Sequence, residues 1–328
     1  MIVRSLVRTK VILRMAFPGF PSPAGPKPDL HVIWEDAELV AYLHPQPWTP
    51  GATVLTQKKP SGPSSIFHLP LVEYEALMRG ARAVAALLCR QVPVHRCGLI
   101  AEPRPGQPAH VKVLPMHGVE PVWRPHLAGE QEFSPQYPGY CTSKNGPRAA
   151  DSELELIQAR IRARLPSPAP VSYRFLGDPS DDNLFARIVR GAEEQQWRVW
   201  EDDAHVALLT PFPNTPGYTV LVPRRHLPSD LFGLEEDDYR ELTLAAHRVA
   251  LLLEEGLGAQ SCALMFEGYE IDYAHAKLIP LHVPPQSPEP PAPQFTPRYS
   301  GHLSSVDGPP ASAQHLLELQ AKITQGGS

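Results

Sequence analysis

The chain contains the same segment twice. Residues 34–55 and 200–221 are identical at 14 of 22 positions at an offset of 166, which chance does not produce. The match continues through two apolar helical patterns, at residues 74–88 and 239–253, and through residues 108–117 and 273–282. It ends in residues 133–147 and 295–309, which share 7 of 15 positions. Each half of the chain is therefore one copy of a unit of about 130 residues, and any fold must contain that unit twice.

Within each unit, the hydrophobic pattern predicts a hairpin, a helix and a further strand. Residues 40–43 and 53–56 have strand patterns on either side of a turn that ends in Pro50-Gly51, and residues 206–209 and 219–222 repeat them around Pro216-Gly217. Residues 235–255 carry apolar side chains at helical spacing, with acidic residues in the first turn where the helix dipole favours them. A strand is predicted over residues 274–279, and a helix over residues 152–164 closes the first unit. This order predicts the α+β class, with an antiparallel sheet and packed helices in each unit.

Proline marks the boundaries between these units. The chain has 40 prolines in 328 residues, well above the usual share of about 5%, and they cluster near residues 18–28, 166–170 and 284–293. The clusters predict a flexible leader over residues 1–28, a first unit over 29–165, a Pro-rich linker over 166–180 and a second unit over 181–328.

Charge and composition limit the ligands and the location. A formal net charge of -5 argues against nucleic-acid binding, which usually needs a basic face, whereas a small phosphorylated ligand needs only a local site. No apolar run approaches the roughly 18 residues that span a bilayer, and charges interrupt any signal-peptide core near the start. The four cysteines have neither metal nor disulfide spacing. We therefore expect a cytoplasmic protein that binds neither nucleic acid nor membrane.

A histidine and a lysine stand two residues apart near the end of the second unit. Strand alternation places Tyr273, His275 and Lys277 on one face, turned toward a cleft. A neutral imidazole can attack phosphorus and leave again, which splits one substitution into two easier steps. The lysine ammonium could bind phosphate oxygens, and it disfavours imidazolium by like-charge repulsion. The pair therefore suits a phosphate site.

The first unit repeats this pair as His110 and Lys112, with Pro108 in place of the tyrosine. An isolated pair of this kind is more often a polar patch on the open face of a strand, but its recurrence in both units favours a phosphate site. His117 and His282 follow each strand, two residues beyond a proline. They either approach the same cleft or cap backbone carbonyls, and both readings remain open at this point.

The pattern resembles the histidine-triad (HIT-like) superfamily, whose signature strand carries His-x-His-x-His-x-x and often ends in proline. The second unit is similar to it along almost its full length, from residues 183–191 through the Pro216-Gly217 hairpin and residues 224–226 to the strand of His275. Matched by the proline, His275 and His110 fall where the family has its middle histidine, the nucleophile that takes up a nucleotidyl or phosphoryl group. The resemblance implies catalytic roles for His275, Lys277, His110 and Lys112.

The motif departs from the family in two of its three histidines. Lys277 and Lys112 replace the third, and Tyr273 and Pro108 replace the first. Galactose-1-phosphate uridylyltransferase is similar in replacing the third histidine, there with glutamine, while it keeps the central one.

Two further departures concern ligands. His44 and Thr210 stand where many relatives carry the acidic or amide residue that holds a ribose. Asn183 and Ala186 stand where many relatives carry a zinc-binding cysteine pair. We therefore expect no structural metal and no cofactor.

HIT-like proteins are typically two-fold dimers in which C-terminal elements approach the partner's site. The resemblance thus implies that the two halves pair as an intramolecular pseudo-dimer in a monomeric chain. The first half keeps the fuller tail, with Tyr140 and Arg148, and the second keeps the fuller strand motif. Our hypothesis is one working site on His275, Lys277 and His282, to which Tyr140 and Arg148 contribute; the alternative is that the tail motifs are turn signals alone.

Three functions follow from these observations. The first is a hydrolase or nucleotidyltransferase that acts on a phosphoanhydride, phosphoramidate or phosphoester through a covalent nucleotidyl-histidine. Its substrate would be a small nucleotide or a nucleotide-sugar-like phosphate. The second is a catalytically inactive nucleotide-binding or sensing protein, which the tyrosine and lysine replacements favour. The third is an interaction scaffold that binds nucleotide in neither half.

Overall fold

A computed structural model describes residues 30–60, 62–166, 170–193, 197–283 and 288–325. The described residues from His31 onward form one compact unit. The leader predicted over residues 1–28 lies outside the described residues, as does part of the predicted linker. Among the described residues, no helix has the length and apolar character needed to cross a membrane.

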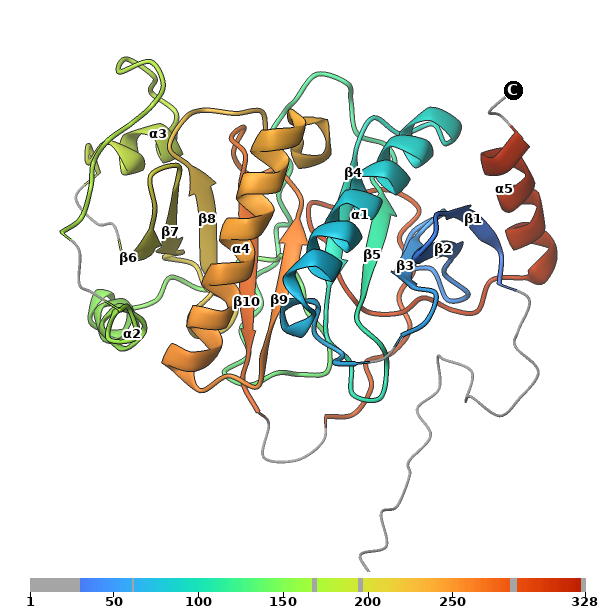
Figure 1. The fold of residues 1–328 in the computed structure, drawn as a ribbon, viewed down its shortest axis with the longest axis horizontal. Coiled ribbons are helices and arrows are strands. Elements are labelled where there is room, and N and C mark those ends of the chain that lie inside the picture. Colours follow the sequence, from blue (N-terminus) through green and yellow to red (C-terminus); the bar gives the residue numbers. More distant parts are fainter. Residues whose placement is uncertain (1–29, 61, 167–169, 194–196, 284–287, 326–328) are drawn as a thin grey trace, which may run out of the picture. The chain divides into compact units, whose positions relative to one another are not determined.

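The core of this compact unit, which contains both copies of the repeat, is one ten-stranded sheet (Figure 1). Its strand order is β1-β2-β3-β5-β4-β9-β10-β8-β7-β6. All its strand pairs are antiparallel. The first half of the chain supplies β1 Val32–Glu35, β2 Leu39–Leu43, β3 Thr53–Gln57, β4 Cys97–Ala101 and β5 His110–Pro115. The second half supplies β6 Arg198–Glu201, β7 His205–Leu209, β8 Thr219–Pro223, β9 Ser261–Phe266 and β10 Ala276–Leu281. The predicted α+β class and the paired arrangement of the two halves are therefore confirmed.

The two halves join through β4 and β9, where Ile100 stands opposite Met265. These residues are 165 positions apart, which is the offset of the sequence repeat in this region. A pseudo-two-fold axis consequently passes between them. Backbone pairing across this axis makes one continuous sheet out of two copies of the unit, as a two-fold interface does between subunits.

Two long helices, α1 Leu71–Gln91 and α4 Glu236–Leu257, lie side by side on one face of the sheet (Figure 1). A buried tyrosine of each helix donates a hydrogen bond to the backbone of the other. Tyr74 of α1 donates to the backbone oxygen of Thr243 at 2.7 Å, and Tyr239 of α4 donates to that of Met78 at 2.9 Å. Their apolar faces pack on alternate side chains of the strands. The other face of the sheet is covered by the tails, whose Cys141, Tyr299 and Leu303 pack on Ile100 and Met265.

The helices that end the two tails are exchanged between the halves. Helix α2, Asp151–Arg162, packs on α4 and β6 of the second half, and α5, Ala313–Gln325, packs on β1 and α1 of the first (Figure 1). Equivalent hydrogen bonds fix both, from Gln158 Nε2 to the backbone oxygen of Arg198 at 2.9 Å and from Gln320 Nε2 to that of Val32 at 2.8 Å. The helix predicted over residues 152–164 is present as α2, and it packs on the second half because the tail crosses the sheet before the helix begins.

The strand that carries the second-half motif begins later than predicted. Strand β10 starts at Ala276, where it pairs with Leu221 of β8. Two residues earlier in the same register, Ala274 would stand opposite Pro223, which has no amide hydrogen to give. Ala274 donates instead to the backbone oxygen of Leu227 at 2.8 Å. His275 therefore lies just ahead of the strand rather than within it.

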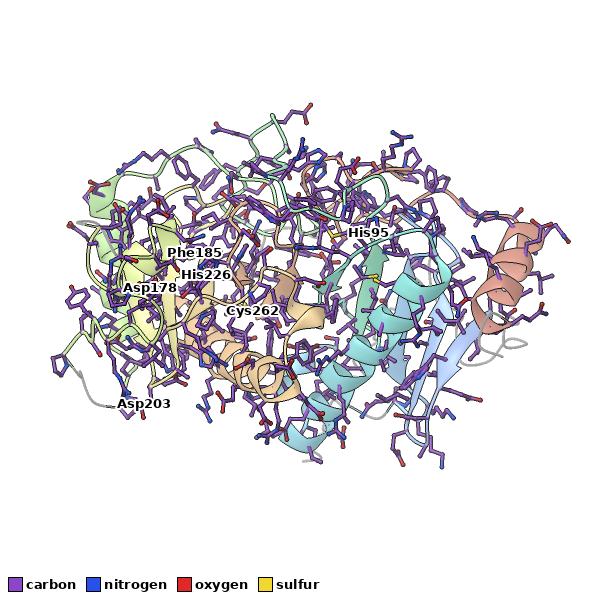
Figure 2. All side chains as sticks on the ribbon, turned by 90° about the horizontal axis from the view of Figure 1, so that it is seen from above. His95, Asp178, Phe185, Asp203, His226 and Cys262 are labelled. Atoms are coloured by element: carbon purple, nitrogen blue, oxygen red, sulfur yellow. The ribbon has the colours of Figure 1, made fainter. Side chains whose placement is uncertain are left out.

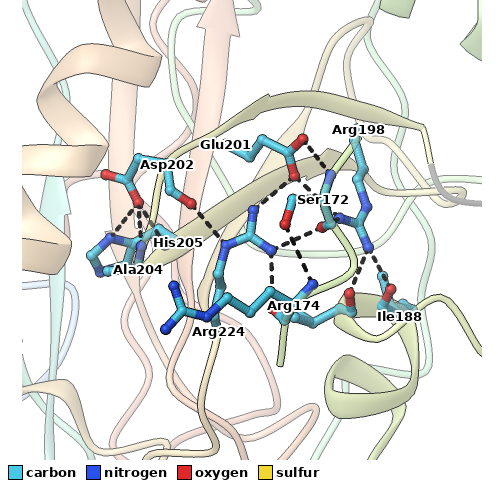
Figure 3. Close-up of polar contacts among 10 residues, drawn as sticks. Ser172, Arg174, Ile188, Arg198, Glu201, Asp202, Ala204, His205 and Arg224 are labelled. Carbon is cyan, nitrogen blue, oxygen red and sulfur yellow. Dashed lines mark hydrogen bonds and ion pairs between the residues drawn. The ribbon is translucent and has the colours of Figure 1, made fainter. Parts of the chain in front are cut away.

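Two buried arginines attach the end of the predicted linker to the sheet (Figure 3). Arg198 and Arg224 are 1% and 2% exposed, and both contact Glu201 Oε2, at 3.2 and 2.8 Å. Each also donates to the backbone oxygen of Ser172, at 2.7 and 2.9 Å, and Arg224 donates to that of Arg174 at 3.1 Å. The segment after residue 170 is thus held by charge-assisted hydrogen bonds.

Candidate functional site

His275 is held in one orientation by its own backbone. Its Nδ1 lies 2.7 Å from the backbone oxygen of Tyr273. A carbonyl oxygen only accepts hydrogen bonds, so the proton sits on Nδ1 and the lone pair on Nε2. The side chain is buried, and burial, followed by the charge of Lys277, lowers the pKa of His275. Near neutral pH the ring is therefore uncharged, with Nε2 in the form that can attack phosphorus.

His110 repeats this arrangement in the first half. Its Nδ1 is 2.9 Å from the backbone oxygen of Pro108, and burial lowers the pKa of His110 to about 4. The predicted middle histidines are thus equivalent in tautomer and in burial. Both rings are buried, and Lys277 and Lys112 are charged neighbours that lower their pKa values further.

Lys277 has a carboxylate partner that the sequence pattern did not reveal. Its Nζ lies 2.6 Å from Glu267 Oε2 and 3.6 Å from Glu270 Oε2. The side chains of Lys277 and Glu267 are 4% and 3% exposed. Burial disfavours the ammonium, but Glu267 more than compensates and raises the pKa of Lys277. The lysine is therefore charged, and that charge is already balanced within the protein.

Lys112 takes a different partner. Its Nζ lies 2.6 Å from Oδ1 of Asp307, which comes from the tail of the second half. Glu102 corresponds to Glu267 in the repeat, yet it pairs with Arg104, whose Nε is 2.8 Å from Glu102 Oε2. The two His-x-Lys motifs are therefore alike in their histidines and different in their charge networks.

Each site is completed by the tail of the opposite half. Ser143, in the first tail, donates to Glu267 Oε1 at 2.8 Å, and Ser305, in the second tail, donates to Glu102 Oε1 at 2.8 Å. Asn145 adds a hydrogen bond of 3.0 Å to Glu270 Oε1. Ser143 and Ser305 stand at the same position of the two tail motifs, and it is one of the positions at which the motifs are identical. The alignment of the two tails was therefore the signal that could have located them.

The two carboxylates also accept from the tail of their own half. Tyr299 donates to Glu267 Oε1 at 2.7 Å, and Tyr137 donates to Glu102 Oε1 at 3.0 Å. Both tails consequently meet at both sites, and the order of each site depends on the packing of the two copies.

Tyr140 and Arg148 lie in the tail that reaches the second-half site, but they have other partners. Tyr140 donates to Glu132 Oε1 at 2.5 Å. Arg148 is exposed and pairs with Asp151 at 2.8 Å, at the start of α2. The residues of this tail that contact the second-half carboxylates are Ser143 and Asn145, not the two that the hypothesis named.

Tyr273 is buried against the second hairpin. Its hydroxyl donates to the backbone oxygen of Pro223 at 2.7 Å, and its ring stacks on His226 at 4.7 Å between centroids. Phe185, from the short helix α3 Leu184–Val189, lies 5.5 Å from the ring of His275 (Figure 2). Aromatic rings thus line one side of the histidine.

The two strand-end histidines bind the hairpin turns. His282 Nε2 lies 2.8 Å from the backbone oxygen of Pro216, and His117 Nε2 lies 2.8 Å from that of Pro50. These contacts match the carbonyl-capping reading. A contact of either histidine with a substrate stays a prediction.

A small hollow is lined by Lys277. Residues 126–128, Ser143 and Asn145 of the first half and Glu267, Glu270 and Gly301 of the second half also line it. Its free space is enough for about one water molecule. His275 is not among its lining residues, so a cleft shared by His275 and Lys277 stays a prediction, and a nucleotide does not fit in this hollow as it stands.

Asn183 and Ala186, which replace the zinc-binding cysteines of relatives, have ordinary structural roles. Asn183 caps α3 by accepting from the backbone amide of Phe185 at 3.0 Å, and Ala186 is buried. Within the described residues, no group of three or more His, Cys, Asp or Glu side chains is arranged to hold a metal ion.

No family model matches the chain. An uncharacterised HIT-like protein of Saccharolobus solfataricus is 28% identical over 102 residues, which cover 30% of this chain and 72% of that protein. A hypothetical histidine triad nucleotide-binding protein from Sulfolobus tokodaii has 22% identity, a TM-score of 0.29, and coverage of 43% of this chain and 89% of its own. A uridylyltransferase structure has 12% identity, a TM-score of 0.48, and coverage of 98% and 93%.

The chain is similar in sequence to a HIT-like protein, and its two halves pair in one antiparallel sheet. Both halves carry His-x-Lys where the triad of HIT-like proteins would stand.

Proposed function

We propose that this protein is a nucleotide hydrolase or nucleotidyltransferase that acts on a phosphoanhydride, phosphoramidate or phosphoester through a covalent nucleotidyl intermediate on His275. One observation carries the proposal: the hydrogen bond from Nδ1 to the Tyr273 carbonyl leaves Nε2 unprotonated and fixed. A nucleophilic imidazole needs that tautomer.

In the first step, the Nε2 lone pair forms a bond to phosphorus and the bond from phosphorus to the leaving group breaks. In the second step, water or an acceptor hydroxyl attacks the same phosphorus, loses a proton, and releases Nε2. The chain's contribution is to keep the imidazole neutral and oriented. Lys277 assists as a positive charge that opposes protonation of the ring.

The second-half site is the proposed working site. It combines His275, Lys277 and His282 with the tail of the first half, of which Ser143 and Asn145 make the observed contacts. Participation of Arg148 requires it to leave Asp151. That exposed pair is weak, so little free energy opposes the move.

Residues 126–128 line the small hollow at Lys277, which has space for about one water molecule. Nucleotide-sized ligands occupy pockets of roughly 300 Å³ or more. We therefore propose that the loop moves when a small nucleotide or nucleotide-sugar phosphate binds. We further propose that the chain works as a monomer in the cytoplasm.

The test is to incubate the purified chain with adenosine 5′-phosphoramidate and with dinucleoside polyphosphates. We expect release of mononucleotide and an acid-labile adduct that peptide mapping locates on His275. Absence of both turnover and adduct would reject the enzyme.

A specific observation favours the alternative, a binding or sensing protein without turnover. The Lys277 ammonium is paired with Glu267, so its charge is not free for phosphate oxygens in this state. Binding of AMP without turnover or adduct would identify this second function. If AMP binds to neither half, the interaction scaffold is the function that remains.

A further inference from the structure

We propose that the first half contains an anion-binding site formed by His44, Arg104 and Lys112, and that the chain closes it with its own carboxylate, Asp307. This site is distinct from the proposed chemistry at His275 and does not require it. Its ligand class is a phosphomonoester or free phosphate, which would take the place of Asp307.

Three donors converge on this one carboxylate. Lys112 Nζ lies 2.6 Å from Asp307 Oδ1, and Arg104 Nη1 lies 2.8 Å from Oδ2. His44 Nε2 lies 3.4 Å from Oδ1. Because the backbone amide of Gln46 donates to His44 Nδ1 at 3.0 Å, the ring proton is on Nε2 and points toward Asp307. The donors thus surround a position that an oxyanion occupies.

The second half has other residues at three of the four positions of this cluster. The repeat aligns the two sites residue by residue, and the corresponding residues there are Thr210 for His44, Tyr269 for Arg104 and Asn145 for Asp307. Lys112 alone has an equivalent, Lys277, which pairs with Glu267 instead. A structural ion pair needs only one cation, whereas an anion site uses several convergent donors.

The charges of the cluster show what Asp307 neutralises. Glu102 balances one of the two cations, Arg104 and Lys112, and Asp307 balances the other. Removal of Asp307 leaves one positive charge in excess at a site where the lysine side chain is 9% exposed. A cation so poorly hydrated needs an anionic partner, so a soluble anion is expected to enter.

The position has a route to solvent. Asp307 is 23% exposed, and His44 also lines an apolar hollow of about 200 Å³ beside it. Pro309 and Pro310, next along the chain from Asp307, form part of that hollow. Displacement of Asp307 would therefore open the anion position toward a space that accepts a small organic group.

The experiment compares the full chain with its Asp307→Ala variant by isothermal titration with inorganic phosphate and with AMP. We expect Asp307→Ala to bind phosphate at least ten-fold more tightly than the parent chain. Adding Arg104→Gln should remove that gain. Asp203→Ala is the matched control, because Asp203 is exposed and lies between β6 and β7, at the edge of the sheet formed by the second half, and it should behave as the parent chain does.

Equal phosphate affinity in Asp307→Ala and the parent chain overturns the proposal, as does a gain that survives Arg104→Gln or appears with Asp203→Ala. If the alanine variant does not fold, Asp307→Asn keeps the shape of the side chain and removes only its charge. There we expect about a three-fold gain, and no gain counts against the site. Turnover at His275 enters neither readout, so the two proposals can fail separately.

Discussion

Ser143 and Glu267 belong to different copies of the repeat, yet the Ser143 hydroxyl donates to Glu267 Oε1 at 2.8 Å in the buried centre of the molecule. The equivalent bond joins Ser305 to Glu102 at the same distance. The halves are therefore linked by their sites as well as by the β4–β9 pairing, since each carboxylate accepts a hydrogen bond from the opposite half.

The first prediction concerns this link. Ser143→Ala should lower the free energy of unfolding by about 1 to 3 kcal/mol, because a buried carboxylate oxygen loses a donor. Urea unfolding followed by circular dichroism measures the change. Ser152→Ala, an exposed serine at the start of α2, should stay within about 0.5 kcal/mol. Equal effects of the two variants would mean that the Ser143 contact does not contribute to stability.

The second prediction separates the two histidines. His275→Ala should abolish turnover and the covalent adduct, whereas His110→Ala should retain most of the turnover. Both rings are buried at equivalent places, so each variant controls for the stability cost of the other. Equal losses of turnover from the two variants would reject a single working site.

The third prediction concerns pH. Burial lowers the pKa of His110 to about 4 and, with the charge of Lys112, that of His44 to about 3, while a free histidine titrates near 6.5. The unfolded chain therefore binds more protons below pH 6.5, and stability is lost as the pH falls from about 6.5 toward 4. Each histidine contributes a slope of up to about 1.4 kcal/mol per pH unit.

The measurement is urea unfolding between pH 4.5 and 7. His110→Gln should reduce the slope, and His315→Gln, at an exposed position on α5, should leave it unchanged. Carboxylates such as Asp307 titrate below this window, because Lys112 and Arg104 outweigh burial and lower the pKa of Asp307. An unchanged slope in His110→Gln would show that this histidine is not buried in its neutral form.

The fourth prediction concerns the paired arginines of Figure 3. Glu201→Gln should destabilise the fold by about 3 kcal/mol, because Arg198 and Arg224 would remain buried without their shared carboxylate. Asp203→Asn, two residues away and exposed, should change stability by less than about 0.5 kcal/mol. Thermal unfolding measures both changes. If Glu201→Gln leaves the stability unchanged, the backbone oxygens alone satisfy the two guanidinium groups.

Local pattern in the sequence was enough to predict the repeated unit. The hairpin strands, the motif strand and the long helix were placed to within about two residues, because they depend on turn prolines and glycines and on the spacing of apolar residues. Strands β1, β4, β6 and β9 were not predicted. The two-residue difference at the start of β10 comes from Pro223, which lies on the neighbouring strand and outside the segment whose pattern was used.

The hydrogen-bond and ion-pair partners of the site side chains were not predicted correctly, because several of them come from the opposite half of the chain. The sequence placed His275 and Lys277 beside each other. Glu267 meets Lys277 within the second half, whereas Ser143 and Asp307 reach the sites because the tails cross to the opposite half. Tyr140 and Arg148 were chosen for their chemistry within the correct tail, and the fold directs them elsewhere.

The sequence by itself determined that the unit occurs twice and which segments form the hairpins, the long helices and the motif strands; the roles of His275 and His110 stay predictions. Only the tertiary structure decided which tail completes which site and which carboxylate each lysine meets. The physical reason is that periodicity and turn chemistry act between near neighbours in the chain, whereas a buried charge is paired by whatever residue the packing brings within hydrogen-bond distance.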